Sequence, residues 1–141
     1  MKIELGKSIK IFKSKKGNEV VFRYPQKDDF QAVWRFACDL AAEDTFVELS
    51  GSGPTREEEQ KWFGDVLKNV SEGKTIHITV VVGGTYAGNA EVRRGKYRKN
   101  HLGEIGLSLA PAFRDEGIGT EVLKALIDES RALGLRLLTI N

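Results

Sequence analysis

The chain has 141 residues, of which 40% are hydrophobic and 30% charged, and these values are typical of a single soluble globular domain. Its 22 basic residues are nearly balanced by 20 acidic ones, so the net charge of +2 does not indicate nucleic acid or a membrane surface as a partner. The longest apolar run, residues 80–82, is too short to span a bilayer, and the amino terminus lacks an apolar signal-peptide core. The single cysteine, Cys38, cannot form an internal disulfide, so we expect a cytoplasmic protein.

The first 25 residues predict extended structure. Residues 1–17 are interpreted as an N-terminal extension or hairpin. Residues 18–25 predict a strand that ends at Pro25, because proline lacks the amide that a central strand needs.

Two helices are predicted next, each opening with a capping box, in which an N-cap side chain and a side chain three residues later satisfy free backbone amides. The first box pairs Asp28 with Gln31, and the second pairs Thr55 with Glu58. Residues 43–54 between the helices predict a long surface loop. The buried face of the second helix is expected to comprise Trp62, Phe63, Val66, Leu67 and Val70.

The second half of the chain changes to strand periodicity. Residues 75–82 and 85–94 predict a hairpin with a Gly-Gly turn. Residues 102–110 predict a third strand, in which apolar residues alternate with Glu104, Gly106 and Ser108.

A helix is expected to follow, with Val122 and Leu126 on its buried face, and Gly134 is expected to end it. Residues 135–140 predict one more strand. A strand, helix and strand of this length predict a right-handed crossover between parallel strands.

The strongest functional signal is the turn that opens this last helix. Gly117 and Gly119 stand three and five residues after Arg114. Free amides and the positive end of the helix dipole gather there, so the turn can bind an anion, with Arg114 adding a charged contact. It is not a P-loop, because no Lys-Ser/Thr pair follows, and Val122 occupies the place of the third glycine of a dinucleotide fingerprint. A tight turn without a ligand is the other interpretation of the glycines.

Residues 104–140, which contain this turn, closely resemble the central motif of the GNAT superfamily of acetyl-CoA-dependent N-acetyltransferases. In that family a splayed strand is followed by an R/Q-x-x-G-x-G/A turn and a helix. Arg114, Gly117 and Gly119 match the turn residue for residue.

The resemblance extends more weakly to residues 20–36, which are similar to the family's first strand and helix, and to residues 86–92, which are similar to its third strand. It implies an α/β (α+β) fold of the GNAT type, with a mixed, mainly antiparallel sheet and helices on both faces. The acetyltransferase domain would occupy residues 18–141.

The resemblance also implies a binding mode for acetyl-CoA. The turn would hold the pyrophosphate of coenzyme A, at Arg114, Asp115, Glu116, Gly117, Ile118, Gly119 and Thr120. The pantetheine arm would run along the preceding strand, where Leu107, Ser108 and Leu109 offer backbone groups. The amide of Leu109 is the best candidate to polarise the thioester carbonyl.

A base must deprotonate the acceptor, because an alkylamine with a pKa of about 10 is almost entirely ammonium at neutral pH. Glu104 is the predicted base, since it lies on the strand that leads into the turn, near the position of a catalytic glutamate in several GNAT enzymes. An ordinary polar strand residue is its alternative role. His101 and His77 are the other candidates, and Cys38 has no histidine near it in sequence to support a nucleophilic mechanism.

The resemblance ends early, because GNAT domains usually continue through another helix and two more strands after the strand at residues 135–140. That segment commonly carries a tyrosine that protonates the departing thiolate. Tyr24, Tyr86 and Tyr97 lie on no matching motif, so no residue is predicted as the acid. We therefore expect a C-terminally incomplete domain. A homodimer that covers the last strand's edge and a degenerate binder are the alternatives.

The predicted reaction is direct transfer of an acetyl group from acetyl-CoA to a primary amine, either a small polyamine-like molecule or the amino group of a protein or peptide. Glu43, Asp44 and Glu48 could attract such a cation, although a solvated acidic loop also explains them. One alternative is a non-catalytic acyl-CoA-binding or regulatory module. Another is a nucleic-acid binder that uses the basic residues Arg93, Arg94, Lys96, Arg98 and Lys99.

Overall fold

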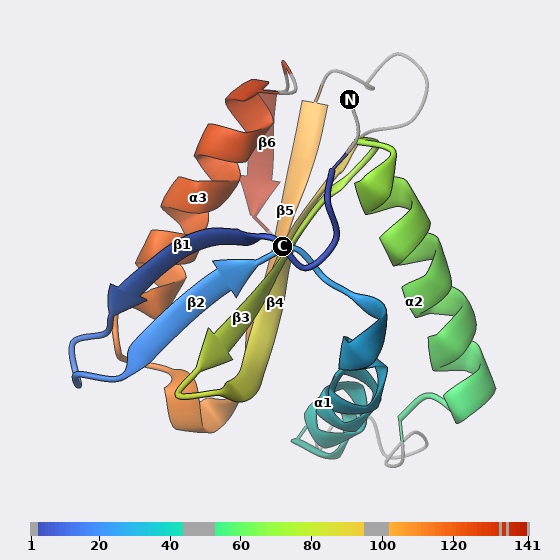
Figure 1. Ribbon diagram of the computed structural model, residues 1–141, viewed down its shortest axis with the longest axis horizontal. Coiled ribbons are helices and arrows are strands. Elements are labelled where there is room, and N and C mark those ends of the chain that lie inside the picture. The colour runs from blue at the N-terminus through green and yellow to red at the C-terminus, as the bar shows by residue number, and fades with distance from the viewer. Residues whose placement is uncertain (1–2, 44–52, 95–101, 133, 135, 141) are drawn as a thin grey trace.

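The computed structural model describes residues 3–43, 53–94, 102–132, 134 and 136–140. Within these residues, six strands form one sheet with helices on both faces (Figure 1). Helices α1 (Phe30–Glu43) and α2 (Arg56–Ser71) cover one face, and α3 (Ile118–Ala132) covers the other. This arrangement confirms the predicted fold class. No helix in the described part of the chain is long and apolar enough to cross a membrane.

The strands follow one another across the sheet in the order of the sequence. They are β1 (Ser8–Lys13), β2 (Glu19–Arg23), β3 (Ile76–Val82), β4 (Thr85–Arg94), β5 (Leu102–Leu109) and β6 (Arg136–Ile140). Neighbours are antiparallel from β1 to β5, whereas β5 and β6 are parallel. The crossover through α3 therefore gives the parallel pair that the sequence predicts.

The first helix begins differently from the prediction. A 3-10 turn, Lys27–Asp29, precedes α1, and the side chain of Asp29 accepts the amide of Gln26 at 3.0 Å. The predicted box between Asp28 and Gln31 is wrong because Arg23 on β2 holds the Asp29 carboxylate through two contacts, of 2.6 and 2.8 Å. An ion pair between residues six apart in sequence thus selects Asp29, instead of Asp28, for the capping box that precedes α1.

The second capping box forms as predicted. The amide of Glu58 donates to Thr55 Oγ1 at 3.2 Å, and the amide of Thr55 donates to the Glu58 carboxylate at 2.9 Å. The hydrogen bonds of this box involve only four consecutive residues, which explains why local sequence was enough to identify it.

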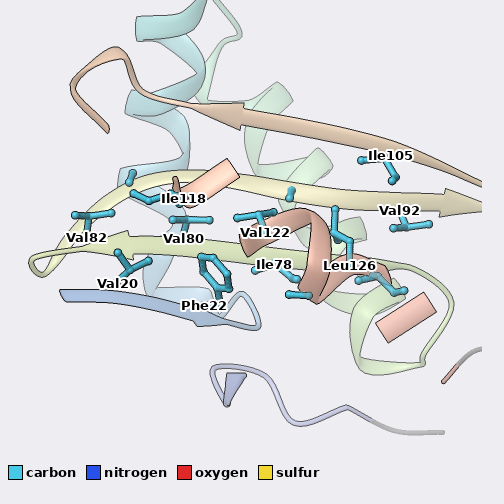
Figure 2. Close-up of a cluster of buried hydrophobic side chains, with 14 residues drawn as sticks. Val20, Phe22, Ile78, Val80, Val82, Val92, Ile105, Ile118, Val122 and Leu126 are labelled. Atoms are coloured by element: carbon cyan, nitrogen blue, oxygen red, sulfur yellow. The ribbon is translucent and has the colours of Figure 1, made fainter. Parts of the chain in front are cut away.

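The main hydrophobic core lies between the sheet and α3 (Figure 2). Ile118, Val122 and Leu126 of α3 are almost fully buried against the strands. Their strand partners include Val20, Phe22, Ile78, Val80, Val92 and Ile105. This packing fixes the first turn of α3 close to the end of β5, because Ile118 is both the first residue of the helix and a core residue.

Candidate functional site

The turn between β5 and α3 presents backbone amides that the helix itself does not use. The carbonyl of Gly117 accepts the amide of Glu121 at 3.4 Å, so Gly117 stands at the N-cap of α3. The amides of Ile118, Gly119 and Thr120 then fall in the first helical turn, where no intrahelical acceptor is available. Together with the helix dipole, these amides make the turn suitable for an anion such as a pyrophosphate.

The two glycines of the turn serve different purposes. Gly117 has a φ of 81°, a left-handed conformation that favours glycine, and Asp115 also has a positive φ of 64°. Gly119 has no such requirement. A Cβ placed there would meet, among the described atoms, only Leu107 Cδ2 at 3.7 Å, which is an ordinary contact. Packing against the described atoms therefore does not require a glycine at position 119, whereas a ligand that approaches the free amides would require one.

The side chain of Glu116 is directed toward the β1–β2 hairpin, away from the free amides of the turn. Its carboxylate accepts hydrogen bonds from Ser14 Oγ at 2.7 Å and Asn18 Nδ2 at 3.0 Å, and the residue is only 2% exposed. These two hydrogen bonds hold the pKa of Glu116 below its ordinary value. The carboxylate is therefore ionised at neutral pH and joins the turn to the β1–β2 hairpin.

The β1–β2 hairpin also brings a cation to the turn. The Lys15 amide donates to the carbonyl of Glu116 at 3.2 Å, and Lys15 Cε lies 3.1 Å from the point where a Cβ on Gly117 would stand. Lys10 on β1 forms an ion pair of 2.6 Å with Glu121 in the first turn of α3. Residues 7–17 contain several lysines, but no local pattern in the sequence indicated where this segment would dock.

Alternate residues of strand β5 direct their backbone amides and carbonyls away from β4. The Ala110 amide donates to the carbonyl of Ala87 at 2.8 Å, so by antiparallel alternation Ser108 directs its backbone groups to β4 and Leu109 directs its groups outward. Leu107 is outward-directed for the same reason. Within the described residues β6 pairs with β5 only from Leu102 to Ile105. The outer edge at Leu107 and Leu109 is therefore not covered by β6 there.

Arg114 links this edge to the turn. Its Nε donates to the carbonyl of Leu109 at 3.0 Å, and the side chain is exposed. Leu107 and Leu109 place their side chains against the core under α3. Backbone edge, arginine and helix N-terminus therefore form one continuous surface.

The predicted base, Glu104, stands on the same strand. In the β4–β5 ladder Glu104 is paired with Arg93, Gly106 with Glu91, and Ser108 with Asn89. Glu104 is thus four residues before Ser108 and separated from the turn by the length of β5.

A small cavity of about 240 Å³ lies on the face covered by α1 and α2. It is lined by Val33, Phe36, Ala37, Leu40, Glu59, Trp62, Asn89 and Ser108. Sequence reasoning missed Glu59, which is only 7% exposed and whose pKa burial raises. The prediction that Trp62 is buried was wrong, because its side chain is 41% exposed at this cavity, whereas Phe63 and Val70 are buried as expected.

His77 is a poor candidate for a base. The residue is 3% exposed, its ring meets that of Trp62 edge to face with centroids 6.0 Å apart, and burial lowers its pKa to about 4. It is therefore neutral at physiological pH, and because only 3% of the residue is exposed, an acceptor amine has little access to its ring. His101, Tyr97 and residues 44–52, with Asp44 and Glu48, lie outside the described residues.

The two described tyrosines that were considered as acids have other partners. Tyr24 donates to Glu129 at 2.9 Å, and burial with this hydrogen bond raises its pKa to about 12. The hydroxyl of Tyr86 accepts Asn89 Nδ2 at 2.9 Å. Neither contact points to a thiolate-protonating role.

Comparisons with known proteins identify the family and the fold of this chain. A family model described as an acetyltransferase (GNAT) domain matches residues 19–141. An acetyltransferase of the GNAT family from Streptococcus pneumoniae has a TM-score of 0.70 and 22% identity, and the match covers 85% of this chain and 73% of that one. RimL, a ribosomal L7/L12 alpha-N-protein acetyltransferase in complex with coenzyme A, has a TM-score of 0.72 and 16% identity over 94% of this chain and 73% of that chain.

A third similar structure, YncA from Salmonella typhimurium with its cofactor acetyl-CoA, has a TM-score of 0.66 and 17% identity over 85% of this chain and 68% of that one. No curated protein matches the sequence. The chain belongs to the GNAT acetyltransferase family, which confirms the predicted resemblance. It is an N-acetyltransferase, and acetyl-CoA is its co-substrate.

Proposed function

We propose that this domain transfers the acetyl group of acetyl-CoA directly to a primary amine. The observation that carries the proposal is the continuity between the outward edge of β5 and the amides at the N-terminus of α3. The outward edge of β5 can bind the extended pantetheine arm through backbone hydrogen bonds. The amides at the N-terminus of α3 can bind the phosphates of coenzyme A. The acceptor would be a small polyamine-like molecule or an amino group of a protein. Ribosomal-protein acetyltransferases among the similar structures favour the latter.

The cofactor would lie along this continuous surface. The amides from Gly117 to Thr120 would bind the pyrophosphate, with the Arg114 guanidinium beside them. Asp115 and Glu116 would contribute backbone only, since the carboxylate of Glu116 is held by the hairpin. The side chain of Ile118 belongs to the core and would take no part.

The pantetheine arm would contact the outward backbone groups of Leu107 and Leu109. Ser108, whose backbone groups face β4, would contribute its side chain to the opposite, acceptor face. The amide of Leu109 would donate to the thioester oxygen as negative charge develops on it, which stabilises the transition state more than the ground state.

In the chemical step the neutral amine nitrogen would form a bond to the acetyl carbon, and the carbon–sulfur bond would break. Glu104 would accept the proton lost by the amine, directly or through one water. The coenzyme A thiolate would leave and take a proton from solvent, since no described side chain is assigned as the acid.

The proposal is tested by two linked measurements. Thermal unfolding with excess acetyl-CoA should show a higher midpoint, and release of coenzyme A thiol should then be followed with a panel of primary amines. Stabilisation together with thiol release supports the proposal. Stabilisation without turnover on any amine would instead favour a non-catalytic acyl-CoA-binding module.

The proposed function carries two further expectations, one about cellular location and one about oligomeric state. A cytoplasmic location agrees with a single cysteine, Cys38, which is partly buried and free. A homodimer that covers the β6 side of the sheet would be visible as a doubled mass in solution scattering.

A further inference from the structure

Glu59 is a buried carboxylate that has no cationic partner within the described part of the chain. It projects from α2 into the cavity of about 240 Å³ and is 7% exposed. No described lysine, arginine or histidine forms an ion pair with it, although Arg23 and Asp29 nearby pair with each other at 2.6 Å. A buried charge in this position is costly unless a cation neutralises it.

We propose that Glu59 binds the cationic nitrogen of the acceptor amine, and that the cavity between α1, α2, β4 and β5 is the acceptor pocket. This inference rests on the proposed function, because it assumes an amine acceptor. It names Glu59 as the group that selects the acceptor, in place of Glu43, Asp44 and Glu48.

The lining of the cavity has the chemistry that an alkylammonium requires. Glu59 is the charged residue of the lining in the described part of the chain. Val33, Ala37 and Leu40 supply an apolar wall for an alkyl chain. The exposed ring of Trp62 can attract the cation through its π face, and such contacts contribute about 0.5–2 kcal/mol.

The remaining ionisable groups around the cavity do not compete for Glu59. The His77 ring, which packs against Trp62, is neutral because burial lowers its pKa to about 4. Tyr86 is also neutral, since burial raises its pKa. Asp29 is engaged by Arg23. Burial raises the pKa of Glu59 itself, and a bound ammonium would oppose this effect by stabilising the ionised form.

The cavity also has a suitable position and size. Ser108 and Asn89, which face each other on β5 and β4, form part of its lining. Ser108 lies between Leu107 and Leu109, so the acceptor and the proposed thioester strand share one segment of β5. At about 240 Å³ the cavity is smaller than the roughly 300–1,000 Å³ of typical drug-sized pockets. It therefore suits a short alkylamine or the tip of an amino-bearing side chain.

The experiment compares n-butylammonium with 1-butanol, which has the same alkyl chain and no charge. Binding to the intact chain is followed by tryptophan fluorescence, because Trp62 lines the cavity. The proteins are wild type, Glu59→Gln, and Glu57→Gln as a control, since Glu57 is exposed on the same helix. We expect wild type and Glu57→Gln to prefer butylammonium by about tenfold or more, and Glu59→Gln to lose this preference.

The inference is overturned if wild type binds butanol as tightly as butylammonium, or if Glu59→Gln retains the preference. Stabilisation by acetyl-CoA is measured on the same three proteins. Equal stabilisation of all three would show that the substitution leaves the cofactor site intact. Absence of stabilisation in wild type would contradict the proposed function, while a charge preference that depends on Glu59 would still identify a cation site.

Discussion

Ser14 Oγ donates a 2.7 Å hydrogen bond to the buried carboxylate of Glu116, across 102 residues of sequence. This contact attaches the β1–β2 hairpin to the turn that opens α3. The turn that we propose for cofactor phosphates is therefore supported by the N-terminal hairpin as well as by the core beneath α3.

Replacing Ser14 by alanine should weaken this attachment in a pH-dependent way. Hydrogen bonds from Ser14 and Asn18 hold the pKa of Glu116 below the ordinary 4.5, so the unfolded chain binds its proton more readily than the folded one. The resulting stability is present above pH 4.5 and is lost as pH falls through the folded pKa. The gap in unfolding midpoint between wild type and Ser14→Ala should therefore be several degrees at pH 7 and shrink in acid. Ser8→Ala, at an exposed position on β1, should show no such gap. A gap independent of pH would contradict the linkage.

Replacing Gly119 by aspartate should abolish binding of acetyl-CoA. A carboxylate there would lie among the amides of the first helical turn and repel the pyrophosphate. Wild type at a hundred times the dissociation constant should gain about 2.7 kcal/mol in stability, and the variant should gain almost none. Gly64→Asp on α2 is the control, because Gly64 is exposed and a Cβ at that position would have no described atom within 4 Å. Retained stabilisation of Gly119→Asp would disprove the assignment of the turn.

Replacing Lys15 by alanine should weaken coenzyme A binding about threefold to tenfold, because its side chain runs beside Gly117 and places a cation near the proposed phosphate site. The effect should diminish at high salt, since the lysine is exposed. Titration calorimetry at two ionic strengths would measure it. Lys61→Ala on α2, across the sheet, should bind normally. If both variants bind equally well, Lys15 has no role at the phosphates.

Replacing Glu104 by glutamine should leave the affinity for acetyl-CoA unchanged and reduce kcat at neutral pH by about 100-fold or more, as expected for loss of a general base. Glu59→Gln should instead raise the KM for the amine more than it lowers kcat. Steady-state kinetics over a range of amine concentrations would separate the two roles. An unchanged kcat in Glu104→Gln would mean that another group accepts the proton.

His77 should make the fold sensitive to mild acid. Burial lowers its pKa to about 4 in the folded chain, below the ordinary 6.5, so the unfolded state binds the extra proton between these values. Stability should fall by about 3 kcal/mol as pH decreases from 6.5 to 4. Chemical denaturation across this range would show the slope, and His77→Gln should flatten it. A slope that persists in the variant would assign the effect to carboxylates.

Local features of the site could be predicted from sequence because their partners are close in the chain. The box between Thr55 and Glu58 spans four residues, and Gly117 adopts its left-handed conformation within a single turn. The predicted crossover follows from the lengths of β5, α3 and β6 and from the handedness of such units. These are properties that a short stretch of residues can impose by itself.

Contacts between distant elements could not be predicted in this way. Helical spacing places Glu59, Trp62 and Phe63 on neighbouring parts of α2, but it does not say which of them meets the sheet and which borders a cavity. Phe63 is buried, Trp62 is 41% exposed, and the polar Glu59 is buried as well. The error at Asp28 arises over a shorter distance, because Arg23 on β2, six residues before Asp29, pairs with Asp29 instead.

Residue types at short, fixed spacing were enough to predict the family, the order of strands and helices, and the glycine turn with Arg114. The docking of the hairpin on Glu116 and the cavity that Glu59 shares with Ser108 could be established only from the folded chain. Those contacts require backbone segments far apart in sequence to be brought together by burial of the core, and no local pattern encodes the distance between them.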